Sequence, residues 1–230
     1  MTPTRLSVII PVFNEQKSIA AILRKIMAVP VDKEIVLVDD GSTDGTRELI
    51  LRDFPVSEKM KVIFHEKNQG KGRAIRTGIE ASTGAAVIIQ DADREYEPMD
   101  YLKLLDALDR EGVNVIYGSR FLEKRKVTSF WHRAVNYFLT LCTNVLFSSR
   151  LTDMETCYKL MRSELVKNLS LESNGFEIEV ELTAKILKKR ERIVEVPISY
   201  KGRTFHEGKK IGWKDGFKAV WMLVHYRLQG

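Results

Sequence analysis

Residues 85–93 read AAVIIQDAD, an apolar run followed by two aspartates, Asp91 and Asp93, with only Ala92 between them. Such a run beside a polar turn is typical of a strand that is buried on both faces of a parallel sheet. Alternate residues of a strand share a face, so the two carboxylates are expected to project together beyond the strand's carboxyl end. Ligands of open α/β sheets bind beyond that edge. The stretch therefore predicts a buried parallel sheet with a polar site where the strands end.

The same alternation of apolar run and polar turn recurs on both sides of this stretch. The other strands expected in the first half of the chain are residues 6–10, 34–38, 61–64 and 114–118. Helices are expected at 18–27 and 101–110, and in the stretches that end near residues 52 and 81. Five strands that alternate with helices predict an α/β, Rossmann-like, mostly parallel doubly wound sheet with right-handed crossovers.

After residue 120 the pattern changes. Residues 130–147 are aromatic-rich and apolar on more than one face, and 213–228 read as a basic amphipathic helix. A helix at 178–189 and a strand at 192–200 lie between them. We find no internal repeat or linker. The simplest division is one domain, 1–230, with a core at 1–120 and a portion at 121–230 that carries the amphipathic helices.

Composition limits the class of partner. The 230 residues are 44% hydrophobic, which is enough for a full core, and the 30% charged residues mix both signs, which argues against disorder. The net charge of +6 predicts an anionic partner: nucleic acid, a phosphorylated small molecule or an anionic membrane surface. Two cysteines outside any metal-ligand spacing, and no apolar run long enough to span a bilayer, predict a cytoplasmic protein that is soluble or peripheral on the membrane.

Asp91 and Asp93 have two interpretations. Mg²⁺ commonly takes one or two carboxylates while phosphates fill other positions, and Glu95 is a candidate third ligand. Such an ion would make a nucleoside diphosphate a better leaving group. Alternatively, the aspartates cap the following helix. A second acidic pair, Asp39 and Asp40, follows the strand at 34–38 and favours a ligand site. Carboxylates at the end of a strand can accept hydrogen bonds from a nucleobase or a ribose. The alternative for this second pair is an Asx turn.

Four segments in this order resemble the family 2 glycosyltransferases of GT-A fold. They are residues 8–15 (VIIPVFNE), 38–44 (VDDGSTD), 68–72 (NQGKG) and 90–93 (QDAD). Three further segments resemble the branch that comprises dolichyl- and polyprenyl-phosphate mannose or glucose synthases: residues 118–120 (GSR), 153–159 (DMETCYK) and 200–210 (YKGRTFHEGKK). The resemblance covers nearly the whole chain, although members commonly append transmembrane helices and this sequence has none.

The resemblance implies a role for particular residues. The donor nucleotide would be bound by Pro11, Phe13, Glu15, Asp39, Asp40, Asp91, Ala92 and Arg133. Mg²⁺ or Mn²⁺ would be held by Asp91, Asp93 and Glu95, although family members often carry Gln at the last position. The catalytic set would be Asp93, Arg120, Arg203 and Lys209, with the basic residues facing the donor and acceptor phosphates. The family pattern Gly-Glu-Ser-Lys is replaced here by EGKK at 207–210, so Lys209 or Lys210 fills the last position.

The implied reaction is metal-dependent, inverting transfer of a hexose from UDP-glucose or GDP-mannose to a polyprenyl or dolichyl phosphate. Residues 1–120 would then bind the nucleotide sugar and 121–230 the acceptor. No His or Glu stands out as a general base, and an acceptor phosphate that is already ionised needs none. The helices at 130–147 and 213–228 are candidates for contact with a membrane surface or a membrane-protein partner; the alternatives are packing in the core and contact with a second copy of the chain.

Other functions fit parts of the sequence. They are transfer to a non-lipid acceptor, a sugar-phosphate nucleotidyltransferase, and a non-enzymatic nucleotide-binding or receiver-like module. A nucleotidyltransferase would usually carry a Gly-rich basic signature after the first strand, where this chain has PVFNE at 11–15. A receiver module would leave the second half unexplained. The clustered carboxylates oppose a nucleic-acid backbone, so no nucleic-acid partner is expected.

Overall fold

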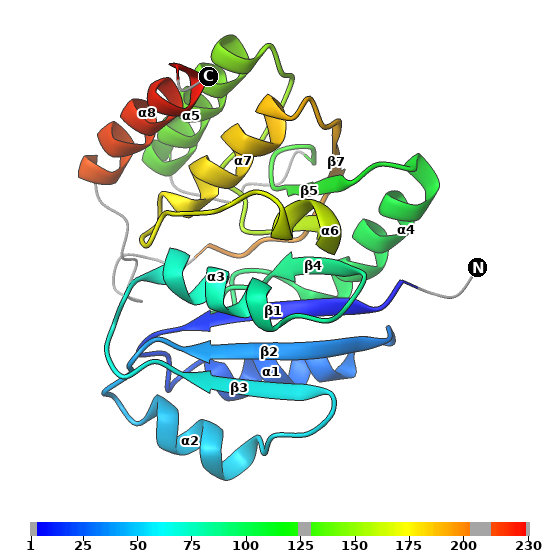
Figure 1. Ribbon diagram of the computed structural model, residues 1–230, viewed down its shortest axis with the longest axis vertical. Helices are drawn as coiled ribbons and strands as arrows, with labels where there is room; N and C mark the ends of the chain where they lie inside the picture. Colours follow the sequence, from blue (N-terminus) through cyan, green and yellow to red (C-terminus); the bar gives the residue numbers. More distant parts are fainter. Residues whose placement is uncertain (1–3, 124–129, 203–212, 229–230) are drawn as a thin grey trace.

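A computed structural model describes residues 4–123, 130–202 and 213–228, with side chains omitted at 130–132 and 213–217. Its centre is one seven-stranded sheet in the order β3-β2-β1-β4-β6-β5-β7 (Figure 1). The strands are β1 (Leu6–Val12), β2 (Lys33–Asp39), β3 (Met60–Phe64), β4 (Ala86–Ile89), β5 (Val115–Ser119), β6 (Lys159–Arg162) and β7 (Ile193–Pro197). All of them run parallel except β6, which is antiparallel to both β4 and β5. The predicted mostly parallel α/β sheet is therefore confirmed.

Helices cover both faces of this sheet. They are α1 (Ile19–Ala28), α2 (Thr46–Asp53), α3 (Lys71–Ala81), α4 (Tyr101–Glu111), α5 (Phe130–Phe147), α6 (Ser163–Lys167), α7 (Ile178–Lys188) and α8 (Trp213–Leu228), with a 3₁₀ turn at Pro98–Asp100. In Figure 1, α3 lies in front of the sheet and α1 behind it. α5, α7 and α8 pack on one another. No helix in the described part of the chain is both long and apolar enough to cross a membrane.

The sheet also includes strands from beyond residue 120, although the core was expected to lie within residues 1–120. β6 was not predicted, and it lies between β4 and β5, so residues from the second half complete the sheet of the first. The predicted strand at 192–200 is β7, which pairs with β5 at the edge. Residues 1–120 and 121–230 thus share one sheet.

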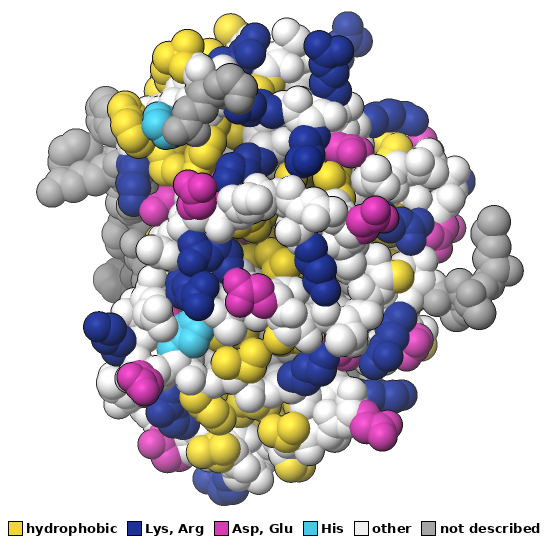
Figure 2. All heavy atoms as spheres, viewed as in Figure 1, with side chains coloured by type: hydrophobic (Ala, Val, Ile, Leu, Met, Phe, Trp, Pro, Cys, Tyr) yellow, Lys and Arg dark blue, Asp and Glu magenta, His cyan; other side chains and the backbone are white. Residues whose placement is uncertain are grey.

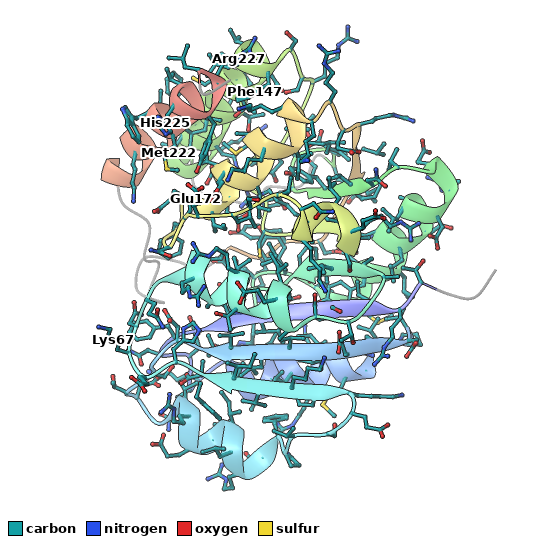
Figure 3. All side chains as sticks on the ribbon, in the orientation of Figure 1. Lys67, Phe147, Glu172, Met222, His225 and Arg227 are labelled. Carbon is teal, nitrogen blue, oxygen red and sulfur yellow. The ribbon has the colours of Figure 1, made fainter. Side chains whose placement is uncertain are left out.

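The polar loops meet at one edge because the strands before them run parallel. Asp39 is the last residue of β2 and Asp40 follows it, while residues 13–15, 91–93 and 120 come after β1, β4 and β5. The carboxyl ends of these strands lie together. In Figure 3, Lys67, in the loop after β3, marks this edge. Apolar strands support it from beneath; all the side chains of β4, for example, are fully buried.

At the opposite edge, a buried carboxylate predicts acid sensitivity. Glu34 accepts hydrogen bonds from Ser7, Thr83 and Gly84, and pairs with Lys61 at 2.9 Å. Burial alone would raise the pKa of Glu34, but these partners outweigh it and lower the pKa from 4.5 to about 2. Since the folded-state pKa is depressed, the stabilisation is present above pH 4.5 and is lost as the pH falls towards 2.

The variant Glu34→Gln tests this carboxylate. We expect the free energy of unfolding at pH 7 to fall by about 2–4 kcal/mol, and its decline between pH 4.5 and 2 to become shallower. Urea unfolding across this pH range measures both quantities. An unchanged slope with pH would contradict the assignment.

Candidate active site

The first two loops at the carboxyl edge are bound to each other. Asn14, which has a positive φ of 54°, donates its backbone N–H to Ser42 Oγ at 2.9 Å. Its side-chain oxygen accepts the N–H of Thr43 at 2.8 Å. Both loops are thereby held in one arrangement beside the end of β1. Three predicted nucleoside contacts lie here, each half-buried: Pro11, Phe13 and Glu15.

Asp40 holds the loop that follows β3. Its carboxylate accepts the backbone N–H groups of Gln69 at 3.0 Å and of Gly70 at 2.7 Å, and contacts His65 Nδ1 at 2.7 Å. The side chain is almost completely buried. These contacts give Asp40 a positioning role towards the NQGKG loop, and its predicted contact with the nucleoside stays a prediction.

The neighbouring residue, Asp39, differs because one of its two carboxylate oxygens has no hydrogen-bond partner among the described residues. Its Oδ2 pairs with Arg47 Nε at 3.2 Å, while its Oδ1 is buried and accepts no hydrogen bond from the residues that the structure describes. A buried acceptor left in this state destabilises the protein by about 1–3 kcal/mol. An N–H group of a ligand would satisfy it.

The turn that carries Asp91 is held from beneath by Gln90. The buried Gln90 accepts hydrogen bonds from the hydroxyls of Tyr101 at 2.6 Å and Tyr158 at 2.7 Å, and its amide nitrogen donates to the Asp91 carbonyl at 3.0 Å. These tyrosines were not predicted as part of the site. They come from α4 and from the segment before β6, so no local pattern connects them with Gln90.

A chain of alternating charges begins at Asp91. Lys71 Nζ lies 2.7 Å from Asp91 Oδ1 and 3.2 Å from Glu179 Oε1, and Glu179 Oε2 lies 2.5 Å from Lys159 Nζ. Burial acts to lower the pKa of Lys71, but the nearby carboxylates, Asp91 first, raise it well above its usual value. Lys71 is therefore a fixed positive charge beside the acidic pair. Neither Glu179 nor Lys159 was predicted, although charged residues within such apolar stretches are a usable signal.

Two glycines allow Lys71 to reach this position. A Cβ at Gly70, whose φ is 99°, would collide with the carbonyl oxygen of Asn174, and one at Gly72 would collide with that of Ser173. Both glycines therefore let the start of α3 pack directly on the segment that leads into α7. The glycines of the NQGKG loop thus serve close packing here.

Asp93 and Glu95 continue the loop after β4. Asp93 Oδ1 accepts the backbone N–H of Glu95 at 3.0 Å, and Glu95 Oε2 accepts the hydroxyl of Tyr200 at 2.6 Å. Among the described residues, no three His, Cys, Asp or Glu side chains are grouped to hold a metal. Two carboxylates completed by phosphate oxygens still match the preference of Mg²⁺ or Mn²⁺ for hard oxygen ligands, and the ammonium beside Asp91 shows that this carboxylate attracts a cation. Ligation by Glu95 stays a prediction.

Arg120, after β5, is held by Asp153. The Arg120 Nε and Nη2 each lie 2.7 Å from an oxygen of that carboxylate, which also accepts the Arg120 backbone N–H and the Asn136 side chain, each at 2.9 Å. The guanidinium lies 5.1 Å from the centre of the Tyr200 ring. Burial would lower the pKa of Arg120, but Asp153 raises it well above its usual range, so the positive charge is permanent.

The remaining predicted cations are not gathered at this point. Arg133 lies exposed on α5. Arg203, Lys209 and Lys210 lie outside the described residues, so their roles stay predictions. A cavity of about 300 Å³ opens beside Arg120; its lining includes the cations Lys25, Arg94, Arg120 and Lys201 and the carboxylates Glu95, Glu97 and Glu123.

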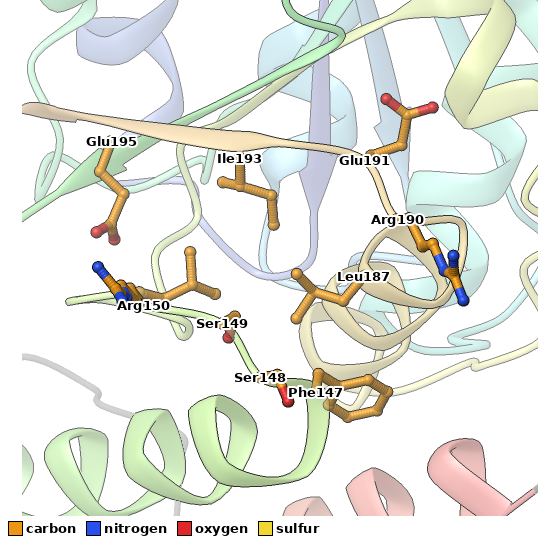
Figure 4. A pocket seen from close by; sticks show the side chains of 10 residues that line it. Phe147, Ser148, Ser149, Arg150, Leu187, Arg190, Glu191, Ile193 and Glu195 are labelled. Carbon is orange, nitrogen blue, oxygen red and sulfur yellow. The ribbon is translucent and has the colours of Figure 1, made fainter.

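A second hollow, of about 420 Å³, lies elsewhere (Figure 4). It is bounded by the end of α5, the end of α7 and Ile193, the first residue of β7, and so lies towards the amino end of that strand. Its lining mixes Arg150 and Arg190 with Glu191 and Glu195. This balance of charge does not match an anionic substrate, so we assign the reaction to the carboxyl edge.

A parallel sheet with one antiparallel strand, and carboxylates and cations gathered at its carboxyl edge, is the arrangement expected of a glycosyltransferase of the GT-A fold. The chain belongs to glycosyl transferase family 2, whose model matches residues 7–170. It is 29% identical to the polyprenol monophosphomannose synthase of Mycolicibacterium smegmatis, with 98% of this chain and 88% of that one covered. It is 28% identical to the dolichol-phosphate mannosyltransferase of Pyrococcus furiosus, with 90% and 60% covered.

Solved structures share the fold. Glucosyl-3-phosphoglycerate synthase from Mycobacterium tuberculosis, in complex with Mn²⁺, uridine diphosphate and phosphoglyceric acid, superposes with a TM-score of 0.72 at 18% identity. The match covers 97% of this chain and 78% of that one. The predicted family, fold and enzyme class are therefore confirmed.

Proposed function

We propose that this chain transfers a hexose from UDP-glucose or GDP-mannose to a polyprenyl or dolichyl phosphate, with inversion at the anomeric carbon. The observation that carries the proposal is the pairing of Asp91 with Lys71 beyond the carboxyl end of β4, at the edge where Asp39 ends the parallel strand β2. The relatives named for transfer of mannose to polyprenol or dolichol phosphate support the acceptor class.

The donor would lie between the two acidic loops. The buried Oδ1 of Asp39 can accept an N–H of a nucleobase, which uracil and guanine both carry. Asp91 and Asp93 would hold Mg²⁺ or Mn²⁺, which would neutralise the diphosphate and so make the nucleoside diphosphate a better leaving group. Lys71, within 2.7 Å of Asp91, adds a second positive charge where the leaving group develops negative charge.

The acceptor would enter from the side of Arg120. Its pair with Asp153 fixes the guanidinium beside a cavity whose lining carries four cations and three carboxylates, and this small excess of positive charge suits a phosphate group. A phosphate oxygen is ionised near neutral pH, so it can attack the sugar without a general base. Direct displacement by that oxygen inverts the anomeric centre.

A nucleotide-binding experiment tests the donor site. With Mn²⁺ present, UDP or GDP at a hundred times its Kd should add about 2.7 kcal/mol of stability. For a chain of this size the melting temperature should then rise by roughly 5–10 °C. Without Mn²⁺ the shift should be much smaller, and the nucleotide that acts identifies the base. Indifference to every nucleoside diphosphate would instead favour a binding module with another ligand.

The acceptor class has a specific alternative. Glu155 has a buried oxygen without a hydrogen-bond partner in the described structure, and burial raises its pKa. A carboxyl of this kind is a candidate base for a hydroxyl acceptor. Transfer of labelled sugar to polyprenyl phosphate, compared with 3-phosphoglycerate and with simple sugars, separates the two classes.

We further propose that α5 and α8 rest on a membrane surface. Both helices expose apolar side chains: Val135, Tyr137, Phe138, Leu141, Val145, Trp221, Val224 and Leu228. Figure 2 shows hydrophobic side chains gathered at the upper left, where α5 and α8 lie in Figure 1. α5 contains no acidic residue, and Arg133 and Arg227 are exposed on the two helices. Exposed aromatic rings with flanking cations are typical of helices that lie in an anionic bilayer interface.

Vesicle flotation tests this face. The chain should float with vesicles that contain phosphatidylglycerol. The pair Phe138→Ser and Trp221→Ser should lower the bound fraction at least about tenfold, because it removes two exposed aromatic rings that the bilayer would bury. Leu51→Ser, at an exposed leucine of α2, is the matched control. If the chain does not float, but forms dimers that the two substitutions dissociate, the face is a contact between copies and the membrane assignment is wrong.

A further inference from the structure

We propose that Glu179 is a positioning residue that takes over Lys71 when a divalent cation binds Asp91. The inference rests on the proposed function, because the cation at Asp91 is part of it. It assigns a task to two buried charged residues, Glu179 and Lys159, that touch neither the cation nor the donor.

The distances define the starting state. Lys71 Nζ is closer to Asp91 Oδ1, at 2.7 Å, than to Glu179 Oε1, at 3.2 Å. The Lys71 side chain is only 15% exposed, so water cannot replace a lost partner fully. If Asp91 held a divalent cation, Lys71 would lose one of its partners and its ammonium would be repelled at short range. Lys71 must then gain a stronger contact elsewhere.

Glu179 is placed to supply that contact. Its Oε1 is buried, and Lys71 does not yet meet it with the geometry of a hydrogen bond. A small shift of the ammonium away from Asp91 would complete this bond. Asp91 and Glu179 thus compete for Lys71, and a cation bound by Asp91 would shift Lys71 towards Glu179.

Lys159 keeps Glu179 available for this task. It is fully buried, lies 2.5 Å from Glu179 Oε2 and donates to the carbonyl of Thr156 at 2.6 Å. A carboxylate in this position would be costly to bury without a cation beside it. Lys159 therefore fixes one oxygen of Glu179 and leaves the other facing Lys71.

The test is a double-mutant cycle read by metal binding. Mn²⁺ is titrated into the chain with saturating UDP or GDP, and its half-saturation is measured by the electron paramagnetic resonance of free Mn²⁺. Glu179→Gln should raise the half-saturation about tenfold, because Lys71 then stays on Asp91 and opposes the cation. In a Lys71→Met background, the same substitution should change it by less than about twofold.

Two further variants separate metal binding from folding. Glu179→Gln leaves Lys159 buried without a counter-charge, so the pair Glu179→Leu and Lys159→Met, which replaces the ion pair by apolar groups, should fold and show the same loss of Mn²⁺ affinity. Glu34→Gln removes a carboxylate from another buried lysine pair, at the far edge of the sheet, and should leave Mn²⁺ affinity unchanged.

The outcomes are distinct. An equal effect of Glu179→Gln in both backgrounds, or none with Lys71 present, would overturn the positioning role while the proposed function stands. Failure of the unsubstituted chain to bind Mn²⁺ with either nucleotide would overturn both.

Discussion

Asp93→Asn is expected to abolish sugar transfer, lowering kcat about a thousandfold or more while the protein stays folded. The amide keeps the shape of the side chain but removes the negative charge that would help hold the cation on the diphosphate. Loss of one preorganised electrostatic contact typically lowers kcat by about 10²–10³, and loss of the metal itself adds to this. Turnover with labelled donor at saturating Mn²⁺ is the measurement.

The fold should tolerate this change. Asp93 Oδ1 accepts the N–H of Glu95, and the side-chain oxygen of asparagine can accept the same bond. The melting temperature should therefore stay within roughly 3 °C of the unsubstituted chain. Asp106→Asn, at an exposed aspartate of α4, is the matched control and should keep full activity. Near-normal turnover by the Asp93 variant would rule out a metal clamp that depends on this carboxylate.

Asp153→Asn should produce the largest loss of stability, about 3–5 kcal/mol, because it leaves the buried Arg120 without its counter-charge. Asparagine cannot reproduce two hydrogen bonds from a guanidinium through two equivalent oxygens. Urea unfolding measures the loss. We also expect the KM for the acceptor phosphate to rise, since Arg120 would no longer be held beside the cavity.

A surface pair provides the comparison for this prediction. Asp109 pairs with Arg162 at 2.9 Å, but its side chain is half exposed. Asp109→Asn should therefore change the free energy of unfolding by less than about 1 kcal/mol. Similar losses for Asp153→Asn and Asp109→Asn would mean that the Arg120 pair is not energetically buried.

The predicted fold agrees with the structure in most strands because each of these strands contains its own apolar run. The runs at 6–10, 34–38 and 85–90 are mostly apolar, with only Ser7, Glu34 and Gln90 as polar residues, and each coincides with a strand. β6 was not predicted because it has only four residues and begins with Lys159, whose charge argues against a buried strand. The carboxylate of Glu179, on α7, supplies the counter-charge that this buried lysine needs, and no local pattern links the two.

The sequence predicted which residues lie at the candidate site better than it predicted what each of them contacts. Asp39 and Asp40 are adjacent and chemically identical, but alternation along the chain sends one towards Arg47 and the other towards the loop at 69–70. Likewise Lys71 stood within a predicted motif, but its partner Glu179 lies more than a hundred residues away in sequence. Long-range pairing of charges decides these roles, and it requires the tertiary fold.

The place of β6 in the sheet has a consequence for how the chain acquires its structure. During synthesis, β1 to β4 emerge before their neighbour, so the apolar edge of β4 remains unpaired until residues 159–162 have been made. An unpaired apolar edge is a template for association with other chains. A fragment that ends at residue 120 would thus expose this edge permanently. Residues 1–120 are therefore expected to depend on the second half for their solubility as a nascent chain.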